Sequence, residues 1–355
     1  MAHVLITGGA GFLGSHTCVA LLQAGHRLVV LDNFSNSGPE ALRRVAALAG
    51  LGVGSVDQWP QAGDWRLRLV RGDIRQREDV EAAFRAGEGA IDAVIHFAGL
   101  KAVAESVRDP LAYWDVNVGG SRCLLAVMGR LGCRTLVFSS SATLYGFPDS
   151  LPIAETAPVR PINPYGNTKA AVEQLLADTA ASASGWRIAC LRYFNPVGAH
   201  PSGRIGEDPS GVPNNLFPFL SQVAVGRRPA LQVYGGDWPT VDGTGVRDFI
   251  HVMDLAEGHT AALDLLWSEP PQRLTLNLGS GRGHSVLEVV RAFERASGLA
   301  VPYVIAERRA GDVASSVADP ALAAARMGWH TRRDLDAMCR DGWAWQRANP
   351  KGYAP

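Results

Sequence analysis

The chain has 355 residues, of which 47% are hydrophobic and 19% charged, and its 34 basic residues balance its 34 acidic ones. A neutral chain of this hydrophobicity can bury a sizeable core. This excludes a disordered protein, and also one recruited by bulk charge to nucleic acid or to an anionic membrane. The 39 glycines exceed the average share, which indicates many tight turns and places where the backbone meets a ligand.

The cysteines indicate a reducing compartment. They are odd in number and form no C-x-x-C pair, so we expect free thiols rather than a disulfide framework or a metal site. Neither a basic segment before the first apolar run nor an apolar stretch of 18 residues is present, so we expect a cytoplasmic protein without a signal peptide or membrane span. The five cysteines are Cys18, Cys123, Cys133, Cys190 and Cys339.

Short apolar runs alternate with helical patterns in the first half of the chain. This alternation predicts βαβ units, and therefore an α/β fold with a Rossmann-type doubly wound parallel sheet. The predicted strands are His3–Thr7, Arg27–Leu31, Arg66–Val70, Ala93–His96, Thr135–Ser139 and Arg187–Arg192. The predicted helices are Leu13–Ala24, Pro39–Ala49, Glu78–Arg85, Leu111–Leu131 and Tyr165–Ala183.

The second half is less regular. We expect one domain in residues 1–192, with segments of about 231–277 returning to it, and a smaller α/β domain mainly in 193–355. Asp254 and Glu257 have the spacing of a capping box. Gly50–Trp65 is predicted to be a surface loop and Pro196–Asn215 a long binding loop. Further predicted elements are strands at Val246–Ile250 and Leu274–Leu278, and helices at Leu255–Trp267, Val286–Ser297 and Asp334–Arg347.

Gly8, Gly11 and Gly14 stand between the first strand and the first helix. In that context, the spacing predicts a turn whose backbone N–H groups approach a pyrophosphate at a helix N-terminus. Asp32, at the end of the second strand, has the spacing of a carboxylate that accepts hydrogen bonds from an adenosine ribose, which favours NAD over NADP. Asp73 is either an adenine contact or a turn aspartate. Lys101, after the fourth strand, is either a ligand contact or a solvated lysine.

Tyr165 and Lys169 are four residues apart, so on a helix their side chains share a face. A phenol is a poor base at neutral pH, but a neighbouring ammonium group and a cationic nicotinamide ring would stabilise the phenolate and lower its pKa. A serine hydroxyl at the end of the fifth strand, Ser139–Ser141, can hydrogen-bond the reacting substrate oxygen. Alone, the Tyr–Lys spacing also fits a solvated helix face. Combined with the glycine turn, it predicts general acid–base chemistry.

The glycine turn, the serine-rich strand end and the Tyr165–Lys169 pair resemble the motifs of the extended short-chain dehydrogenase/reductase superfamily. The motifs TGGAGFLGSH, GDIR, FSSSATLYG, NPYGNTK, LRYFNPVGAHPSG and DGTGVRDFIHVMDLA resemble the UDP-glucose 4-epimerase family within it along almost the entire chain. The resemblance implies an isomerase with NAD as cofactor, bound by residues 1–192, and a homodimer built on the helices near Leu111–Leu131 and Tyr165–Ala183. The implied NAD contacts are Gly8, Gly11, Phe12, Leu13, Asp32, Asn33, Asn36, Ser37, Asp73, Ile74, Phe97, Ala98, Gly99, Lys101, Asn117, Ser139, Tyr165, Lys169 and Tyr193.

The same resemblance implies a catalytic trio of Ser141, Tyr165 and Lys169, which acts through a 4-keto sugar. Among the residues implied to contact the UDP-sugar, Arg247 and Arg309 carry guanidinium groups, which suit a diphosphate. By itself, either arginine could instead form a surface salt bridge. The implied UDP-sugar contacts are Ser141, Tyr165, Asn195, Asn215, Leu216, Arg247, Arg309, Asp312 and Ser316.

Two alternative functions, a sugar-nucleotide dehydratase and a non-enzymatic dinucleotide sensor, are disfavoured by particular residues of this sequence. Related dehydratases carry an Asp–Glu pair where this chain has Ala142 and Thr143, and neither of these can supply the acid that expels water. A non-enzymatic dinucleotide sensor would typically lack Tyr165 and Lys169.

One departure from the family pattern concerns substrate scope. Ser316 stands where the family often has a bulky tyrosine. A small residue there would enlarge the hexose pocket, so UDP-N-acetylglucosamine and UDP-N-acetylgalactosamine are expected as additional or even main substrates, unless neighbouring side chains fill the space.

Overall fold

The computed structural model describes residues 1–51, 65–87, 89–209, 213, 215–309 and 311–353. The chain forms two compact units, each assembled from separate segments. The first comprises Met1–Leu144, Pro161–Arg192 and Ala256–Leu276. The second comprises Tyr145–Arg160, Tyr193–Leu255 and Asn277–Pro355.

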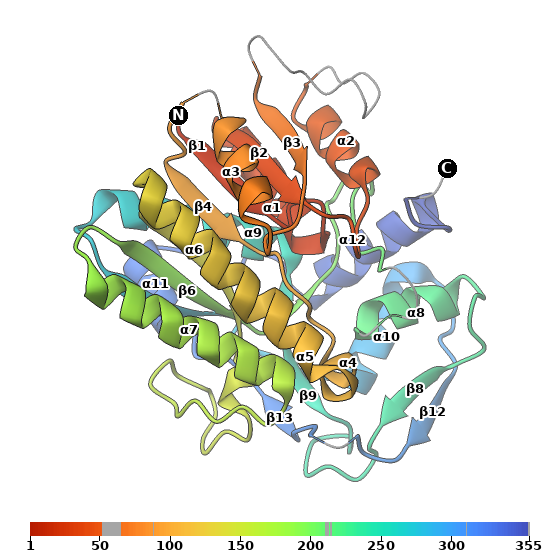
Figure 1. The fold of residues 1–355 in the computed structure, drawn as a ribbon. Helices are drawn as coiled ribbons and strands as arrows, with labels where there is room; N and C mark the ends of the chain where they lie inside the picture. Colours follow the sequence, from red (N-terminus) through yellow and green to blue (C-terminus); the bar gives the residue numbers. More distant parts are fainter. Residues whose placement is uncertain (52–64, 88, 210–212, 214, 310, 354–355) are drawn as a thin grey trace. The chain divides into compact units, whose positions relative to one another are not determined.

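A seven-stranded parallel sheet forms the centre of the first unit, as predicted (Figure 1). From β1 the chain adds β2 and β3 on one side and then crosses back to add β4, β5 and β6 on the other. The order therefore reverses beside β1, where open α/β sheets bind their ligands. Along the sheet the strands are β10 (Arg273–Leu278), β6 (Arg187–Tyr193), β5 (Thr135–Ser141), β4 (Ala93–His96), β1 (His3–Thr7), β2 (Arg27–Asp32) and β3 (Leu67–Arg71).

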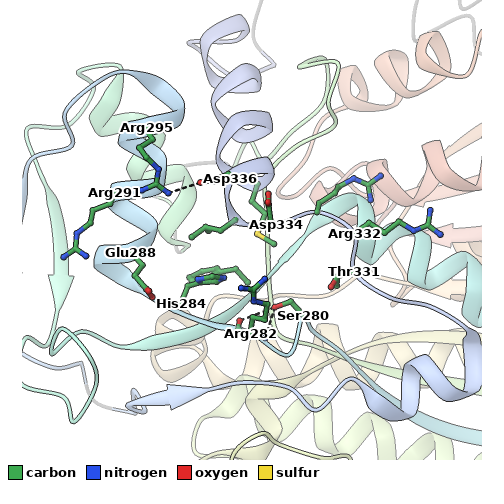
Figure 2. A pocket seen from close by; sticks show the side chains of 14 residues that line it. Ser280, Arg282, His284, Glu288, Arg291, Arg295, Thr331, Arg332, Asp334 and Asp336 are labelled. Atoms are coloured by element: carbon green, nitrogen blue, oxygen red, sulfur yellow. Dashed lines mark hydrogen bonds and ion pairs between the residues drawn. The ribbon is translucent and has the colours of Figure 1, made fainter.

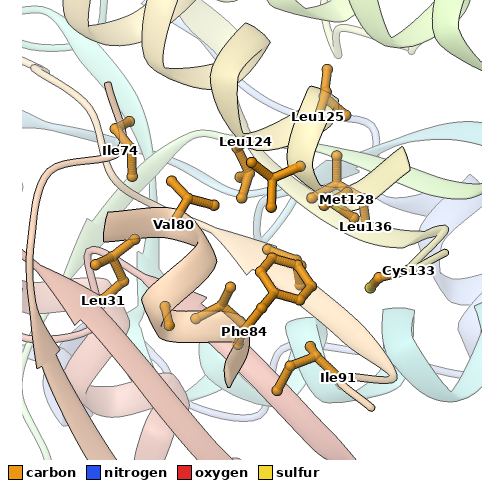
Figure 3. Close-up of a cluster of buried hydrophobic side chains, with 14 of the residues drawn as sticks. Leu31, Ile74, Val80, Phe84, Ile91, Leu124, Leu125, Met128, Cys133 and Leu136 are labelled. Atoms are coloured by element: carbon orange, nitrogen blue, oxygen red, sulfur yellow. The ribbon is translucent and has the colours of Figure 1, made fainter. Parts of the chain in front are cut away.

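Helices flank this sheet, and several of them present an apolar stripe to it. In α3, for example, the buried residues Val80, Ala83 and Phe84 have the i, i+3, i+4 spacing of one helix face. They join Leu124 and Met128 in a cluster against the sheet (Figure 3). The helices that begin in this part of the chain are α1 (Phe12–Gln23), α2 (Pro39–Leu48), α3 (Arg77–Arg85), α4 (Val103–Arg108), α5 (Pro110–Tyr113), η2 (Trp114–Gly119), α6 (Gly120–Leu131), η3 (Ala142–Tyr145) and α7 (Pro164–Ser182), and α9 (Val252–Ser268) returns to it.

Three local predictions differ from the structure. The helix predicted over Leu111–Leu131 is divided, because a π-helical turn, η2, separates α5 from α6. Trp65 is buried in the core of the first unit rather than exposed in a surface loop, while residues 52–64 of that predicted loop lie outside the described part of the chain. Asp254 does not cap a helix. It lies inside α9, where its buried carboxylate binds Arg333.

The second unit contains two small sheets. β9 (Val246–His251) is the centre of one, with β11 (Gly283–Ser285), β13 (Ser315–Ser316) and β7 (Asn195–Val197) paired to it, and β8 (Leu231–Tyr234) pairs with β12 (Tyr303–Ala306) in the other. Short strands give little periodicity, and β7, β8, β11, β12 and β13 were not predicted. The helices are α8 (Leu216–Ala224), α10 (Val286–Ser297), α11 (Ala321–Met327) and α12 (Leu335–Ala348).

All five cysteines are free, and four of them are buried. Within the described residues, no helix is both long and apolar enough to cross a bilayer.

Candidate active site

The glycine turn after β1 has the geometry that its sequence predicted. Gly8 has φ +71°, and a Cβ there would lie 2.7 Å from the Ala98 nitrogen. A Cβ on Gly14 would lie 2.4 Å from the Gly8 oxygen, so this glycine lets α1 pack closely on the turn. By contrast, a Cβ on Gly11 would meet only the Gly8 oxygen, at 3.4 Å. The Gly11 backbone is thus free to approach a ligand, and the three glycines fit the roles found in dinucleotide-binding turns.

The Asp32 carboxylate organises the end of β2 beside this turn. It accepts hydrogen bonds from the Ala10 nitrogen, the Phe34 nitrogen and the Ser37 hydroxyl, each at 2.9 Å. A carboxylate offers about four lone-pair positions, so one remains for a ribose hydroxyl. The residues present therefore fit an adenosine ribose at this strand end. Phe34 has φ +58°, a strained conformation that is uncommon for a residue with a Cβ and concentrates at functional sites. Nothing in the sequence predicted this conformation of Phe34.

Asp73 is more heavily engaged than an adenine contact would require. Its carboxylate accepts two hydrogen bonds from the Arg75 guanidinium, one from the Arg75 nitrogen and one from Asn33 Nδ2. The Arg75 guanidinium is the main cause that lowers the pKa of Asp73 to about 2. Because all four lone-pair positions are occupied, an adenine amine would have to displace one of these donors.

Asn117 braces the loop after β4. Its Oδ1 accepts from the Leu100 nitrogen at 2.8 Å, and its Nδ2 donates to the Leu100 oxygen and to Thr168, each at 3.0 Å. A Cβ on Gly99 would lie 2.9 Å from Asn117 Oδ1, which explains that glycine. Asn117 is buried, so it shapes this loop through contacts within the protein.

The remaining predicted cofactor residues are distributed as follows. Phe12 and Leu13 begin α1, while Ile74 is buried against Gly120. The exposed side chains are Asn33, Asn36 and Lys101. Phe97, Ala98 and Gly99 follow β4 directly, and Tyr193 is the buried last residue of β6.

Tyr165 and Lys169 lie in the first turns of α7. The helix begins where its sequence requires, because Asn163 Oδ1 accepts from the Gly166 nitrogen at 2.9 Å and Pro164 occupies the first turn. Gly166 permits close packing, since a Cβ there would lie 2.9 Å from Pro161 Cβ and 3.2 Å from the Thr143 oxygen. The motif thus sets the start of the helix on which the two side chains stand.

The structure brings Ser141, Tyr165 and Lys169 together. The Ser141 hydroxyl lies close enough to the Tyr165 phenol to affect its pKa, and it donates to Thr143 Oγ1 at 2.8 Å. Lys169 is buried, donates from Nζ to the Ser139 oxygen at 2.7 Å, and places Nζ 5.9 Å from the centre of the Tyr165 ring. A base, a hydroxyl donor and a cation therefore meet at the carboxyl end of β5.

The pKa values of this trio differ from the prediction. Burial raises the pKa of the Tyr165 phenol, and the nearby Ser141 hydroxyl opposes that rise. In the protein without its cofactor, desolvation of the phenol therefore outweighs the stabilisation of the phenolate that was expected from Lys169 together with a nicotinamide ring. Burial also lowers the pKa of the Lys169 ammonium to about 8, against the opposing effect of the Glu173 carboxylate.

Two arginines converge on one carboxylate in the second unit. Arg309 Nε donates to Asp312 Oδ2 at 3.1 Å, and Arg247 Nη2 lies 3.8 Å from Asp312 Oδ1. Arg247 Nη1 is fixed by the oxygens of Val246 and Val313, each at 2.9 Å. Burial lowers the pKa of the Arg247 guanidinium, and Asp312 opposes this effect. The arrangement presents two guanidinium groups together, as binding a diphosphate requires.

The other predicted sugar contacts lie on the same small sheet or on the helix that follows the long loop. Ser316 on β13 is the register partner of Arg247 on β9. Asn195 on β7 is the register partner of Phe249, which also belongs to β9. Asn215 is the residue before α8 and donates to Glu207 at 2.8 Å, while Leu216 is the first residue of the helix.

A separate cavity of about 590 Å³ in the second unit is lined by none of these predicted residues. Most of its charges are already engaged. Arg295 pairs with Asp336 at 2.9 Å (Figure 2). Glu288 accepts from the Ser285 nitrogen at 2.7 Å, and Arg333 pairs with buried Asp254. This cavity therefore lies apart from the two arginines that converge on Asp312.

The fold and the trio define a dinucleotide-binding short-chain dehydrogenase/reductase. The family model described as "NAD dependent epimerase/dehydratase family" matches residues 4–279, and the chain belongs to that family.

Relatives cover the whole chain. It is 51% identical over 350 residues to UDP-glucose 4-epimerase of Bacillus subtilis, covering 99% of this chain and 98% of the relative. A solved UDP-glucose 4-epimerase from Stenotrophomonas maltophila, with bound NAD and formylated UDP-arabinopyranose, is similar at 49% identity and a TM-score of 0.92, covering 99% of both chains. The enzyme from Bifidobacterium longum, in complex with NAD+ and UDP, is similar at 45% identity and a TM-score of 0.91, covering 99% of this chain and 100% of that one.

Proposed function

We propose that this chain interconverts UDP-glucose and UDP-galactose by epimerisation at C4, with NAD as its cofactor. The observation that carries the proposal is the grouping of Ser141 and Tyr165 with buried Lys169, whose Nζ lies 5.9 Å from the centre of the Tyr165 ring. Membership of the NAD-dependent family and similarity to whole UDP-glucose 4-epimerases support the reaction and the cofactor.

In this reaction Tyr165 takes the proton of the sugar 4-hydroxyl while the Ser141 hydroxyl orients the same oxygen. A bound NAD would supply the acceptor for the C4 hydride and the donor for its return to the other face of the 4-keto sugar. Tyr165 then gives the proton back. The Lys169 ammonium stabilises the tyrosinate, because an opposite charge nearby favours the ionised phenol.

The glycine turn and Asp32 would hold the cofactor. The open Gly11 backbone suits the pyrophosphate, and the remaining lone-pair position of Asp32 suits a ribose hydroxyl. Asn117, Phe97, Ala98 and the residues around them would shape the nicotinamide end. Arg247 and Arg309, joined by Asp312, would bind the diphosphate of the sugar nucleotide.

The test is incubation of the purified protein with UDP-galactose, with separation of the two sugar nucleotides by chromatography. We expect UDP-glucose to form, and no NADH to be released, because the reaction involves no net oxidation. Binding of NAD without conversion, even with NAD added, would instead support the dinucleotide sensor. Formation of a dehydrated sugar would overturn the epimerase in favour of a dehydratase, which Ala142 and Thr143 disfavour.

The small side chain of Ser316 supports a wider substrate range. It neighbours Arg247 in the ladder between β9 and β13. We therefore include UDP-N-acetylglucosamine and UDP-N-acetylgalactosamine in the proposal as further substrates.

The proposal extends to a cytoplasmic homodimer. Exposed apolar side chains gather at α4, α5 and the turn that follows, with Val107 62%, Leu111 79% and Trp114 43% exposed, and a second copy could cover them. Free thiols support a reducing compartment. Light scattering after gel filtration tests the dimer. A monomer at micromolar concentration would contradict it, and Leu111→Glu should weaken the association.

A further inference from the structure

Glu173 is a buried carboxylate that the proposed reaction does not use. It lies on α7, and only 7% of its surface is exposed. Its Oε1 accepts from the Ser140 hydroxyl at 2.5 Å and from Arg192 Nε at 3.0 Å, and its Oε2 accepts from Arg192 Nη2 at 2.7 Å. Ser140 belongs to β5 and Arg192 to the adjacent strand β6. A buried ion pair is weak evidence for stability alone, because desolvation offsets the attraction.

The contacts of Glu173 continue a pattern along α7. Tyr165, Lys169 and Glu173 stand one helical turn apart, and each meets a different member of the serine run that ends β5. The Ser141 hydroxyl lies near the Tyr165 phenol, the Ser139 oxygen accepts from Lys169, and the Ser140 hydroxyl donates to Glu173. The carboxylate therefore holds in place the same strand end that positions the catalytic trio.

Glu173 also balances charge. Lys169, Glu173 and Arg192 are all buried, and together they carry one net positive charge. Without the carboxylate, two buried cations would remain in this cluster. Deprotonation of Lys169 would then become easier, because Arg192 keeps its proton at any ordinary pH.

The other titratable groups around Lys169 are held neutral or bound elsewhere. On β4, burial lowers the pKa of His96 to about 3, and on β6 burial raises the pKa of Cys190 to about 12. Tyr113, whose ring packs against Tyr165, donates to Glu105 at 2.8 Å, and burial raises its pKa. The Glu173 carboxylate is the group that opposes the loss of the Lys169 proton.

We propose that Glu173 is a positioning residue for the reaction, which fixes α7 on the end of β5 and keeps the Lys169 ammonium charged beside Tyr165. The catalytic part of this role rests on the proposed function. The electrostatic part concerns the protein alone and can be measured without turnover.

The first experiment titrates Lys169 directly by NMR. The chain has three lysines, Lys101, Lys169 and Lys351, so lysine labelled with carbon-13 at Cε gives three resonances, and Lys169→Met assigns one of them. In Glu173→Gln, which keeps the shape but removes the charge, we expect the titration midpoint of Lys169 to fall by about one pH unit or more. Glu173→Asp, which keeps the charge, should restore most of it.

An unchanged Lys169 midpoint in Glu173→Gln would overturn the proposal. If that variant fails to fold because buried Arg192 loses its ion pair with Glu173, the double variant Glu173→Gln/Arg192→Gln removes both charges and tests the proposal instead. Its Lys169 midpoint should still lie below that of the unmodified protein. A midpoint equal to that of the unmodified protein would again overturn the proposal.

The second experiment measures epimerisation against pH. In Glu173→Gln we expect kcat to fall about tenfold at neutral pH and its alkaline limb to move to lower pH, with KM for the UDP-sugar little changed. Ser140→Ala is the matched control, because it removes one hydrogen bond of Glu173 and leaves every charge, so its alkaline limb should not move. If the unmodified protein converts no UDP-sugar, the proposed function fails, while the NMR titration still decides the role of Glu173.

Discussion

Ser316 is the register partner of Arg247 in the parallel ladder between β13 and β9. Register partners project from the same side of a sheet, so the small hydroxymethyl group stands next to the guanidinium proposed to bind the diphosphate. A bulkier residue at position 316 would therefore occupy space beside a bound sugar nucleotide.

From this we predict that Ser316→Tyr narrows the substrate range. The variant should lose at least about tenfold in kcat/KM for UDP-N-acetylgalactosamine, as expected when added bulk costs about 1–3 kcal/mol, and should keep most of its activity on UDP-galactose. Steady-state kinetics with both sugar pairs is the measurement. Equal losses of kcat/KM on the two sugar pairs would show that Ser316 does not determine substrate specificity. An unmodified protein that is inactive on the N-acetyl sugars would contradict the wider substrate range.

Tyr165→Phe removes the proposed base and little else. The rate of epimerisation should fall by about 10²–10⁴-fold, the usual contribution of a general base. Cofactor content and circular dichroism should match the unmodified protein, because the phenyl ring keeps its packing against Tyr113. Near-normal turnover would show that another group takes the proton.

The pKa of Lys169, lowered to about 8, predicts two effects of pH. The charged ammonium is the active form, so kcat/KM should decline as the pH rises through about 8.

Stability should change in the opposite sense. The pKa of Lys169 is about 8 in the folded chain and has its ordinary value of 10.5 in the unfolded chain. At pH values between these two, the unfolded chain holds the Lys169 proton and the folded chain does not. The free energy of unfolding therefore rises with pH in that window, by up to about 3 kcal/mol. Urea unfolding at several pH values, compared with Lys169→Met, measures the difference. If the difference in unfolding free energy between the unmodified protein and Lys169→Met does not change with pH, the lowered pKa of Lys169 is contradicted.

Gly14→Ala tests the packing of the glycine turn. The new methyl group would lie 2.4 Å from the Gly8 oxygen and 2.6 Å from Gly9 Cα, both backbone atoms, so we expect destabilisation by about 1–3 kcal/mol and weaker NAD binding. Gly38→Ala is the control, because a Cβ there meets nothing within 4 Å and should change stability little. Thermal unfolding of both variants provides the comparison, and equal effects would argue against this account of the turn.

The sequence alone determined much of the first unit. Its strands are continuous apolar runs bounded by helical patterns, and the strand–glycine–helix order identifies a dinucleotide-binding turn without any structure. The spacing of Tyr165 and Lys169 predicted one helix face. The division of the helix at η2 and the burial of Trp65 were missed, because a π turn leaves no local signature and burial depends on distant neighbours.

The tertiary structure alone decided the environments of these groups. Which way the pKa of Tyr165 shifts depends on how deeply the ring is buried, and that follows from packing rather than from the distance to Lys169 along the chain. Asp32 and Asp73 look alike in the sequence as aspartates near strand ends. In the structure, the Asp32 carboxylate keeps one lone-pair position for a ligand, whereas the positions of Asp73 are occupied mainly by Arg75. Glu173 reads as one more polar residue of a helix, and its contacts with Ser140 and Arg192 exist because β5 and β6 are neighbours in the sheet. Local sequence sets which chemical groups a segment carries, whereas burial and partners are set by segments far away in the chain.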